Sequence, residues 1–132
     1  MKNLVITGLG AVTPIGIGVE NYWQGILDMK CGIDKISRFD YSDVPITIAG
    51  EVKDFDPNDH MSSKLAKETG LFIQFAYAAA KEAIEQSQID ISSEPENIGI
   101  VMATALSGTS IIADTEKSYS LEGKKKVSPR FL

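Results

Sequence analysis

The amino-acid sequence predicts an α/β fold in which strands and helices alternate along the chain. Residues 4–7 and 98–103 are short, apolar segments, as expected of strands that are buried on both faces of a parallel sheet. Residues 19–27 and 62–86 instead repeat apolar side chains at helical spacing. This alternation indicates a buried sheet covered by helices.

The chain has the size and composition of one ordinary domain. It has 132 residues, of which 43% are hydrophobic and 23% charged, as in soluble globular proteins. The net charge of −5 argues against a nucleic-acid binder, which usually has a basic surface. No apolar run is long enough to span a bilayer, and glycine and proline break residues 3–19 too often for a signal peptide. The single cysteine excludes an internal disulfide and fits a reducing compartment, so we expect a cytoplasmic protein.

The first half of the chain begins with a strand that runs into a glycine-rich turn, which Pro14 prevents from becoming a helix. The helix over residues 19–27 follows, with one apolar face. Residues 32–45 look irregular, because Gly, Asp, Ser and Pro are spread through them. Residues 46–52 are predicted to form a second strand, and the Asp-Pro-Asn sequence at 56–58 signals a turn after it.

One long helix dominates the second half, capped by Ser62 or Ser63 and running to about Gln86. Its small alanines would allow another backbone to approach closely. A last helix is predicted over residues 109–121, and the lysines at 124–126 lie beyond it in a solvated loop. The apolar face of the long helix consists of Phe72, Ile73, Ala76, Tyr77, Ala80, Ala83 and Ile84.

Gly8-Leu9-Gly10 has the spacing that opens a dinucleotide-binding fingerprint. That motif needs a third glycine three residues after the second, and a helix that starts there and faces the pyrophosphate. Thr13 holds this position and Pro14 follows it, so a nucleotide site is poorly supported. The competing interpretation is that these glycines make tight turns where layers of the fold pack closely.

Short motifs follow one another in a recognisable order along the chain. They are the segment 5–16, Phe39-Asp40, the segment 49–55, Phe72-Ile73-Gln74, Ile98-Gly99, Leu106-Ser107-Gly108 and Val127-Ser128-Pro129. Together they resemble the start of a β-ketoacyl-acyl carrier protein synthase, a condensing enzyme of the thiolase fold. The resemblance covers the whole chain. It implies that residues 1–132 form an incomplete domain, the amino-terminal portion of a layered αβαβα architecture.

The resemblance also implies a reaction for the complete enzyme, a decarboxylative Claisen condensation. The carbanion from malonyl-acyl carrier protein attacks an acyl group held as a cysteine thioester, assisted by two histidines and an oxyanion hole. No nucleotide, metal or other cofactor is implied. The expected partners are an acyl carrier protein and a second chain, either in a homodimer or as a complementing ketosynthase. Because the family keeps its catalytic cysteine and histidines further along the chain, we expect this chain alone to be inactive.

Cys31 and His60 are the single cysteine and histidine, and neither matches a catalytic position of the family. Cys31 follows the carboxyl end of a predicted helix, where the helix dipole disfavours a thiolate. His60 lies in a polar loop, and one histidine cannot build a metal site. We therefore expect Cys31 to be an ordinary surface or half-buried residue and His60 a solvated one.

Leu106 and four lysines match functional positions of the family. Leu106 corresponds to the apolar residue that gates the acyl tunnel, which makes it the predicted substrate-binding residue; plain core packing is the alternative. Lys64, Lys67, Lys125 and Lys126 resemble the basic patches that receive an acidic carrier protein. Such rim charges mainly steer encounter and register. The alternative is that they are solvated lysines without a partner.

Two residues depart from the family pattern just before the Phe-x-Gln motif. Glu68 inserts a negative charge beside the lysines, and Gly70 replaces an aspartate. These departures favour a divergent member or a non-catalytic partner subunit of the chain-length-factor type. An unrelated α/β ligand-binding domain is a third hypothesis. In each case, residues 4–7 and 98–103 need covering layers, and we expect this chain alone to expose them and to associate.

Overall fold

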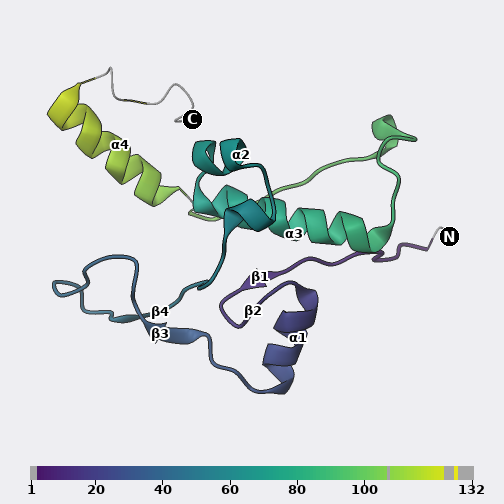
Figure 1. Ribbon diagram of the computed structural model, residues 1–132, viewed down its shortest axis with the longest axis horizontal. Coiled ribbons are helices and arrows are strands. Elements are labelled where there is room, and N and C mark those ends of the chain that lie inside the picture. Colours follow the sequence, from purple (N-terminus) through teal and green to yellow (C-terminus); the bar gives the residue numbers. More distant parts are fainter. Residues whose placement is uncertain (1–2, 107, 124–126, 128–132) are drawn as a thin grey trace.

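The computed structural model describes residues 3–106, 108–123 and 127. Within these residues, helices and very short strands are arranged around one central helix, α3 (Figure 1). The elements in chain order are β1 (Val12–Thr13), β2 (Gly16–Ile17), α1 (Val19–Leu27), β3 (Ile33–Lys35), β4 (Ile48–Gly50), η1 (Pro57–Asp59), α2 (Ser63–Glu68), α3 (Leu71–Ser87), η2 (Pro95–Asn97) and α4 (Thr109–Glu122).

The strands of the described residues form two small antiparallel hairpins. β1 pairs with β2, and β3 pairs with β4. β4 lies inside the strand predicted over residues 46–52, which confirms that prediction. β3, however, lies in the segment 32–45 that was predicted to be irregular. The sequence of β3 does not favour a strand. β3 forms because it pairs with β4, not because of the local preference of its residues.

Residues 4–7 and 98–103 are not strands in this structure, so their prediction was wrong at the level of secondary structure. Neither segment has a strand partner within the described part of the chain. A strand is stabilised by a ladder of hydrogen bonds and by layers over its faces. These segments lack both, and Leu4 is 99% exposed and Val101 93%. The expected exposure of their apolar side chains is therefore confirmed.

The β1–β2 hairpin turns at Pro14, as predicted from the position of that residue. The Thr13 hydroxyl donates a hydrogen bond to the Gly16 carbonyl at 2.9 Å and closes the turn. Gly18 then takes a positive φ of 84° and serves as the N-cap of α1, which a residue with a side chain would adopt only under strain. The turn thus leads directly into the helix predicted over residues 19–27.

The long helix predicted over residues 62–86 is divided into α2 and α3. Ser62 caps α2 as predicted, its hydroxyl accepting the Leu65 N–H at 3.3 Å. Thr69 is extended, with φ −120° and ψ 145°, and Gly70 is the N-cap of α3. A Cβ at position 70 would overlap with the side chain of Ile111. Glycine therefore weakens the helix at this point, and its lack of a side chain leaves room for the Ile111 side chain of α4.

Gly8 and Gly10 pack directly against the backbone of α3. A methyl group on Gly10 would overlap with the Ala79 carbonyl, and one on Gly8 with the Ala83 carbonyl. Gly8 and Gly10 are two residues apart in extended chain, and Ala79 and Ala83 are about one turn apart on α3. Both separations are roughly 6 Å, so each glycine lies opposite one alanine carbonyl. The predicted close approach to the alanines is confirmed. It also accounts for the Gly8-Leu9-Gly10 spacing without a nucleotide, because α3 occupies the space beside these glycines.

Two polar side chains of α3 complete the attachment of the amino-terminal segment. Gln86 Oε1 accepts the Leu9 N–H at 2.6 Å. The Glu82 carboxylate accepts the N–H groups of Ala11 at 3.0 Å and Val19 at 2.7 Å. These side chains accept hydrogen bonds from backbone N–H groups on either side of the β1–β2 hairpin, which the hairpin itself does not pair.

The buried core is small. Only Gly25, Ile36, Met61, Ala78 and the polar Gln74 are buried among the described residues. Much apolar surface therefore stays open, although no helix in the described ranges is both long enough and apolar enough to cross a membrane.

Candidate functional site

The first feature with functional potential is the outward face of α2. Lys64 and Lys67 are exposed and one turn apart on this helix, whereas Leu65 and Ala66 are half-buried. No ion pair involves either lysine within the described residues. Glu68 follows Lys67 at the end of the same helix and is also exposed. Two of the four predicted carrier-binding lysines are thus brought together, while Lys125 and Lys126 lie outside the described residues.

The second feature is an apolar groove of about 720 Å³ between α3 and the extended segment that precedes α4. Most of the predicted apolar face of α3 lines this groove instead of a closed core. Leu106 comes just after the lining segment and is 83% exposed. Its role as an acyl gate stays a prediction. The groove is lined by Phe72, Ile73, Ala76, Tyr77, Ala80, Lys81, Ile84, Glu85, Ile91, Ile100, Met102, Ala103 and Thr104.

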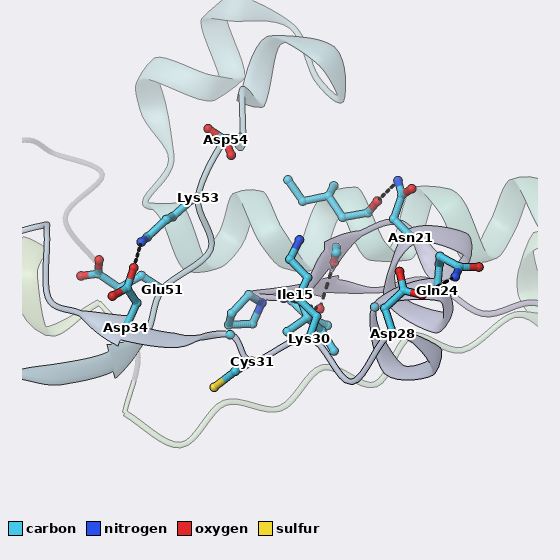
Figure 2. Close-up of a pocket in the computed structure, with 16 residues that line it drawn as sticks. Ile15, Asn21, Gln24, Asp28, Lys30, Cys31, Asp34, Glu51, Lys53 and Asp54 are labelled. Carbon is cyan, nitrogen blue, oxygen red and sulfur yellow. Dashed lines mark hydrogen bonds and ion pairs between the residues drawn. The ribbon is translucent and has the colours of Figure 1, made fainter.

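The third feature is a polar pocket of about 580 Å³ between the β1–β2 turn, α1 and the β3–β4 hairpin. Figure 2 shows its labelled side chains, with the ion pair between Lys53 Nζ and Asp34 Oδ2 at 2.7 Å. The hydrogen bond from Lys53 lowers the pKa of Asp34, and the same bond raises the pKa of Lys53. Glu51 accepts the N–H and hydroxyl of Ser37, which lower its pKa. Three charged residues of the pocket, Asp34, Lys53 and Glu51, thus hold the β3–β4 hairpin together.

Cys31 and His60 are not brought together. Cys31 is exposed on the rim of the polar pocket, and its thiol contacts the Ile33 carbonyl at 3.7 Å. His60 ends η1 and stacks on Phe55, with ring centroids 5.1 Å apart. It is half-buried, so the prediction of a fully solvated histidine was wrong, because the sequence does not show that Phe55 lies beside it. The two residues form no nucleophile–base pair.

No cluster of three or more His, Cys, Asp or Glu side chains suited to a metal ion occurs in the part of the chain that the structure describes.

Sequence reasoning missed the roles of Gln74 and Glu82. Gln74 was noted only as part of a motif, and Glu82 was not singled out. Glu82 accepts hydrogen bonds from backbone groups 71 and 63 positions away, and Gln74 donates to carbonyls of the preceding helix and its C-cap. A polar residue between the consecutive apolar residues Phe72, Ile73 and Phe75 is the local signal that could have pointed to Gln74.

Solved structures similar to this chain define its class. It matches "The ishigamide ketosynthase/chain length factor" with a TM-score of 0.75 and 27% identity, covering 96% of this chain and 32% of that one. It also matches a type II PKS acyl-carrier protein in complex with its ketosynthase bound to the hexaketide, with a TM-score of 0.74. That match has 22% identity and covers 96% of this chain and 33% of the other, so it supports the fold alone. The fold is that of the amino-terminal part of a ketosynthase.

The sequence comparisons define the family. The model for "Beta-ketoacyl synthase, N-terminal domain" matches residues 1–132, and the chain therefore belongs to the β-ketoacyl synthase family. It is 37% identical over 129 residues to 3-oxoacyl-[acyl-carrier-protein] synthase 2 of Synechocystis sp., covering 97% of this chain. The matched region is 31% of that relative, so the chain spans about a third of its length. The predicted α/β, thiolase-like class is confirmed, and the hypothesis of an unrelated ligand-binding domain was wrong.

Proposed function

We propose that this chain is the amino-terminal portion of a condensing enzyme of fatty-acid or polyketide synthesis, an incomplete domain over residues 1–132. The reaction is the decarboxylative condensation of an acyl thioester with malonyl-acyl carrier protein. The observation that carries the proposal is the family match over all 132 residues. The nucleophilic cysteine and the two histidines of the reaction are not among the residues of this chain, and Cys31 and His60 do not replace them.

The contribution of this chain is a surface for the carrier protein and one wall of the acyl site. Lys64 and Lys67 are exposed, adjacent on α2 and without an ion pair in the described residues, which suits a patch that attracts an acidic partner. Lys125 and Lys126 lie outside the described residues, and we assign them to carrier-protein binding from the family resemblance alone. Leu106 gates the acyl tunnel, at the end of the segment that lines the apolar groove. The protein works in the cytoplasm as a homodimer or with a complementing ketosynthase chain.

A partner subunit of the chain-length-factor type is the second candidate. It is favoured by Glu68 and Gly70, which depart from the family pattern beside the lysines. The similar ketosynthase/chain length factor structure supports it as well. Intact mass of the purified material tests this candidate, because a partner subunit should co-purify with a second polypeptide that carries the cysteine. Both candidates predict no acyl transfer to Cys31; a mass increase that Cys31→Ser abolishes would contradict both.

Charge reversal tests the carrier-protein surface. In the assembled enzyme, Lys64→Glu together with Lys67→Glu should slow association with an acidic acyl carrier protein about tenfold at low salt, since rim charges act mainly on encounter. The difference should shrink as salt screens the charges. Lys117→Glu on α4 is the matched control, because this exposed lysine lies on a different helix and its reversal should leave the rate unchanged. An association rate at low salt that the double reversal does not alter overturns the surface.

A further inference from the structure

Gln74 connects α3 to the carboxyl end of α2. It is the one buried polar side chain among the described residues, 7% exposed. Its Nε2 donates hydrogen bonds to the carbonyls of Ala66 at 2.8 Å and Thr69 at 2.9 Å. Both partners are acceptors only, so the side chain must present its NH₂ group to them. The amide therefore ties two backbone groups of α2 and its C-cap to the central helix.

α2 needs such contacts because it has only 6 residues. Isolated helices of this length are unstable, and the last four carbonyls of a helix lack intrahelical partners. The Thr69 hydroxyl donates to the Leu65 carbonyl at 2.7 Å, and Gln74 donates to the next carbonyl, that of Ala66. The carboxyl end of α2 is thus completed from outside the helix, and the Gln74 side chain links it to α3 within the described residues.

The direction of Lys64 and Lys67 follows from the placement of α2. Both side chains are exposed, and neither makes a hydrogen bond or an ion pair within the described residues. Within the described residues, only the backbone of α2 orients them. A contact that fixes this helix against α3 therefore also fixes where the two charges stand.

We propose that Gln74 is a positioning residue that holds α2 in place and so presents Lys64 and Lys67 as a preset pair to an acidic carrier protein. The identity of the partner rests on the proposed function, whereas the hold on α2 does not. A preset pair loses less conformational freedom when the partner binds, which favours affinity. This assigns a role to the glutamine of the Phe72-Ile73-Gln74 motif.

The test compares two identical substitutions on α3 in the full chain. Gln74→Met keeps the length of the side chain but removes both donors, which leaves two carbonyls without their partner. Gln86→Met is the matched control, because Gln86 lies near the other end of α3 and contacts Leu9 instead. Hydrogen exchange should become about tenfold faster at the amides of residues 66–69 in Gln74→Met, relative to the rest of α3. Gln86→Met should leave these amides unchanged.

Affinity for an acyl carrier protein tests the functional consequence. Gln74→Met should weaken binding about fivefold, and Gln86→Met should not. In a Lys64→Ala, Lys67→Ala background the effect of Gln74→Met should disappear, because a residue that acts through the lysines is not additive with their removal. A residue needed only for stability would weaken binding equally in both backgrounds.

The outcomes separate the two proposals. Unchanged exchange at residues 66–69 overturns the hold on α2. Faster exchange with unchanged carrier affinity, while lysine reversal still slows association, overturns the positioning role. If lysine reversal has no effect either, the carrier surface is wrong and the positioning role falls with it. Faster exchange together with a loss of affinity that depends on the lysines supports both.

Discussion

The Glu82 carboxylate accepts the backbone N–H of Val19 at 2.7 Å, although 63 positions separate them in the sequence. Val19 is the first residue of α1, and its N-cap, Gly18, has no side chain to accept this hydrogen bond. Glu82 therefore supplies from α3 the acceptor that a local serine or aspartate usually provides, together with a negative charge that the amino end of a helix favours. Its other oxygen accepts the N–H of Ala11, the residue before β1, so one carboxylate joins the start of the hairpin, α1 and α3.

Glu82→Gln should lower the free energy of unfolding by roughly 1–3 kcal/mol, since an amide oxygen replaces a charged acceptor and the NH₂ group faces a backbone donor. Urea unfolding followed by circular dichroism measures the change. Glu85→Gln is the control, because this exposed residue makes only a 3.9 Å contact with Lys81 and should alter stability little. Equal effects of the two substitutions would show that the link to Val19 does not stabilise the fold.

Gly10→Ala should prevent the amino-terminal segment from seating on α3, because the added methyl group overlaps with a backbone carbonyl that cannot move independently of the helix. In the assembled protein we expect a markedly lower Tm. Gly99→Ala is the matched control, since nothing lies within 4 Å of a Cβ at that position. A Gly10→Ala protein as stable as Gly99→Ala would mean that the contact with Ala79 is not close.

The β3–β4 hairpin should loosen in acid. Hydrogen bonds from Lys53 and Ser37 lower the pKa values of Asp34 and Glu51 below their ordinary values of 3.8 and 4.5. The two carboxylates therefore contribute fully to the stability of the hairpin above pH 4.5, the higher of the two ordinary pKa values. This contribution is lost as the pH falls through their lowered pKa values. NMR shifts of the Ser37 and Arg38 amides should report the change. Glu51→Gln should abolish the response of Ser37, and a response that persists would assign it to another group.

The chain by itself should self-associate or become ordered only with a second chain. Leu4, Val5, Ile100 and Val101 are between 76% and 99% exposed, and exposed apolar segments without a strand partner invite pairing. Light scattering and the fluorescence of a dye for apolar surface measure this. Val101→Lys should reduce both signals, whereas Ser92→Lys, in an exposed polar loop, should not. A monodisperse monomer with a cooperative transition and no dye binding would contradict the prediction.

Local patterns were sufficient for α1, for the starts of α2 and α4, and for the family. The apolar spacing of α1, the serine cap of α2 and the start of α4 at Thr109 are set by neighbouring residues, and the structure has them as predicted. The same holds for the turn at Pro14. Each of these features depends on contacts within a few positions, which is the range over which a sequence pattern carries information. The exposure of Lys64 and Lys67 also follows from their spacing on one short helix.

Tertiary contacts decided the rest. The break at Thr69 and Gly70, strand β3 and the stacking of His60 on Phe55 all depend on residues that are distant or that approach from another element. The same is true of Glu82, which caps a helix 63 positions away, and of Gln74, which holds α2. Residues 4–7 show the converse, since their sequence is that of a strand but no segment that the structure describes pairs with them. By itself, the sequence determined which segments have helix or strand character; only the tertiary structure decided which of them found a partner, because hydrogen-bond ladders and burial require a second surface.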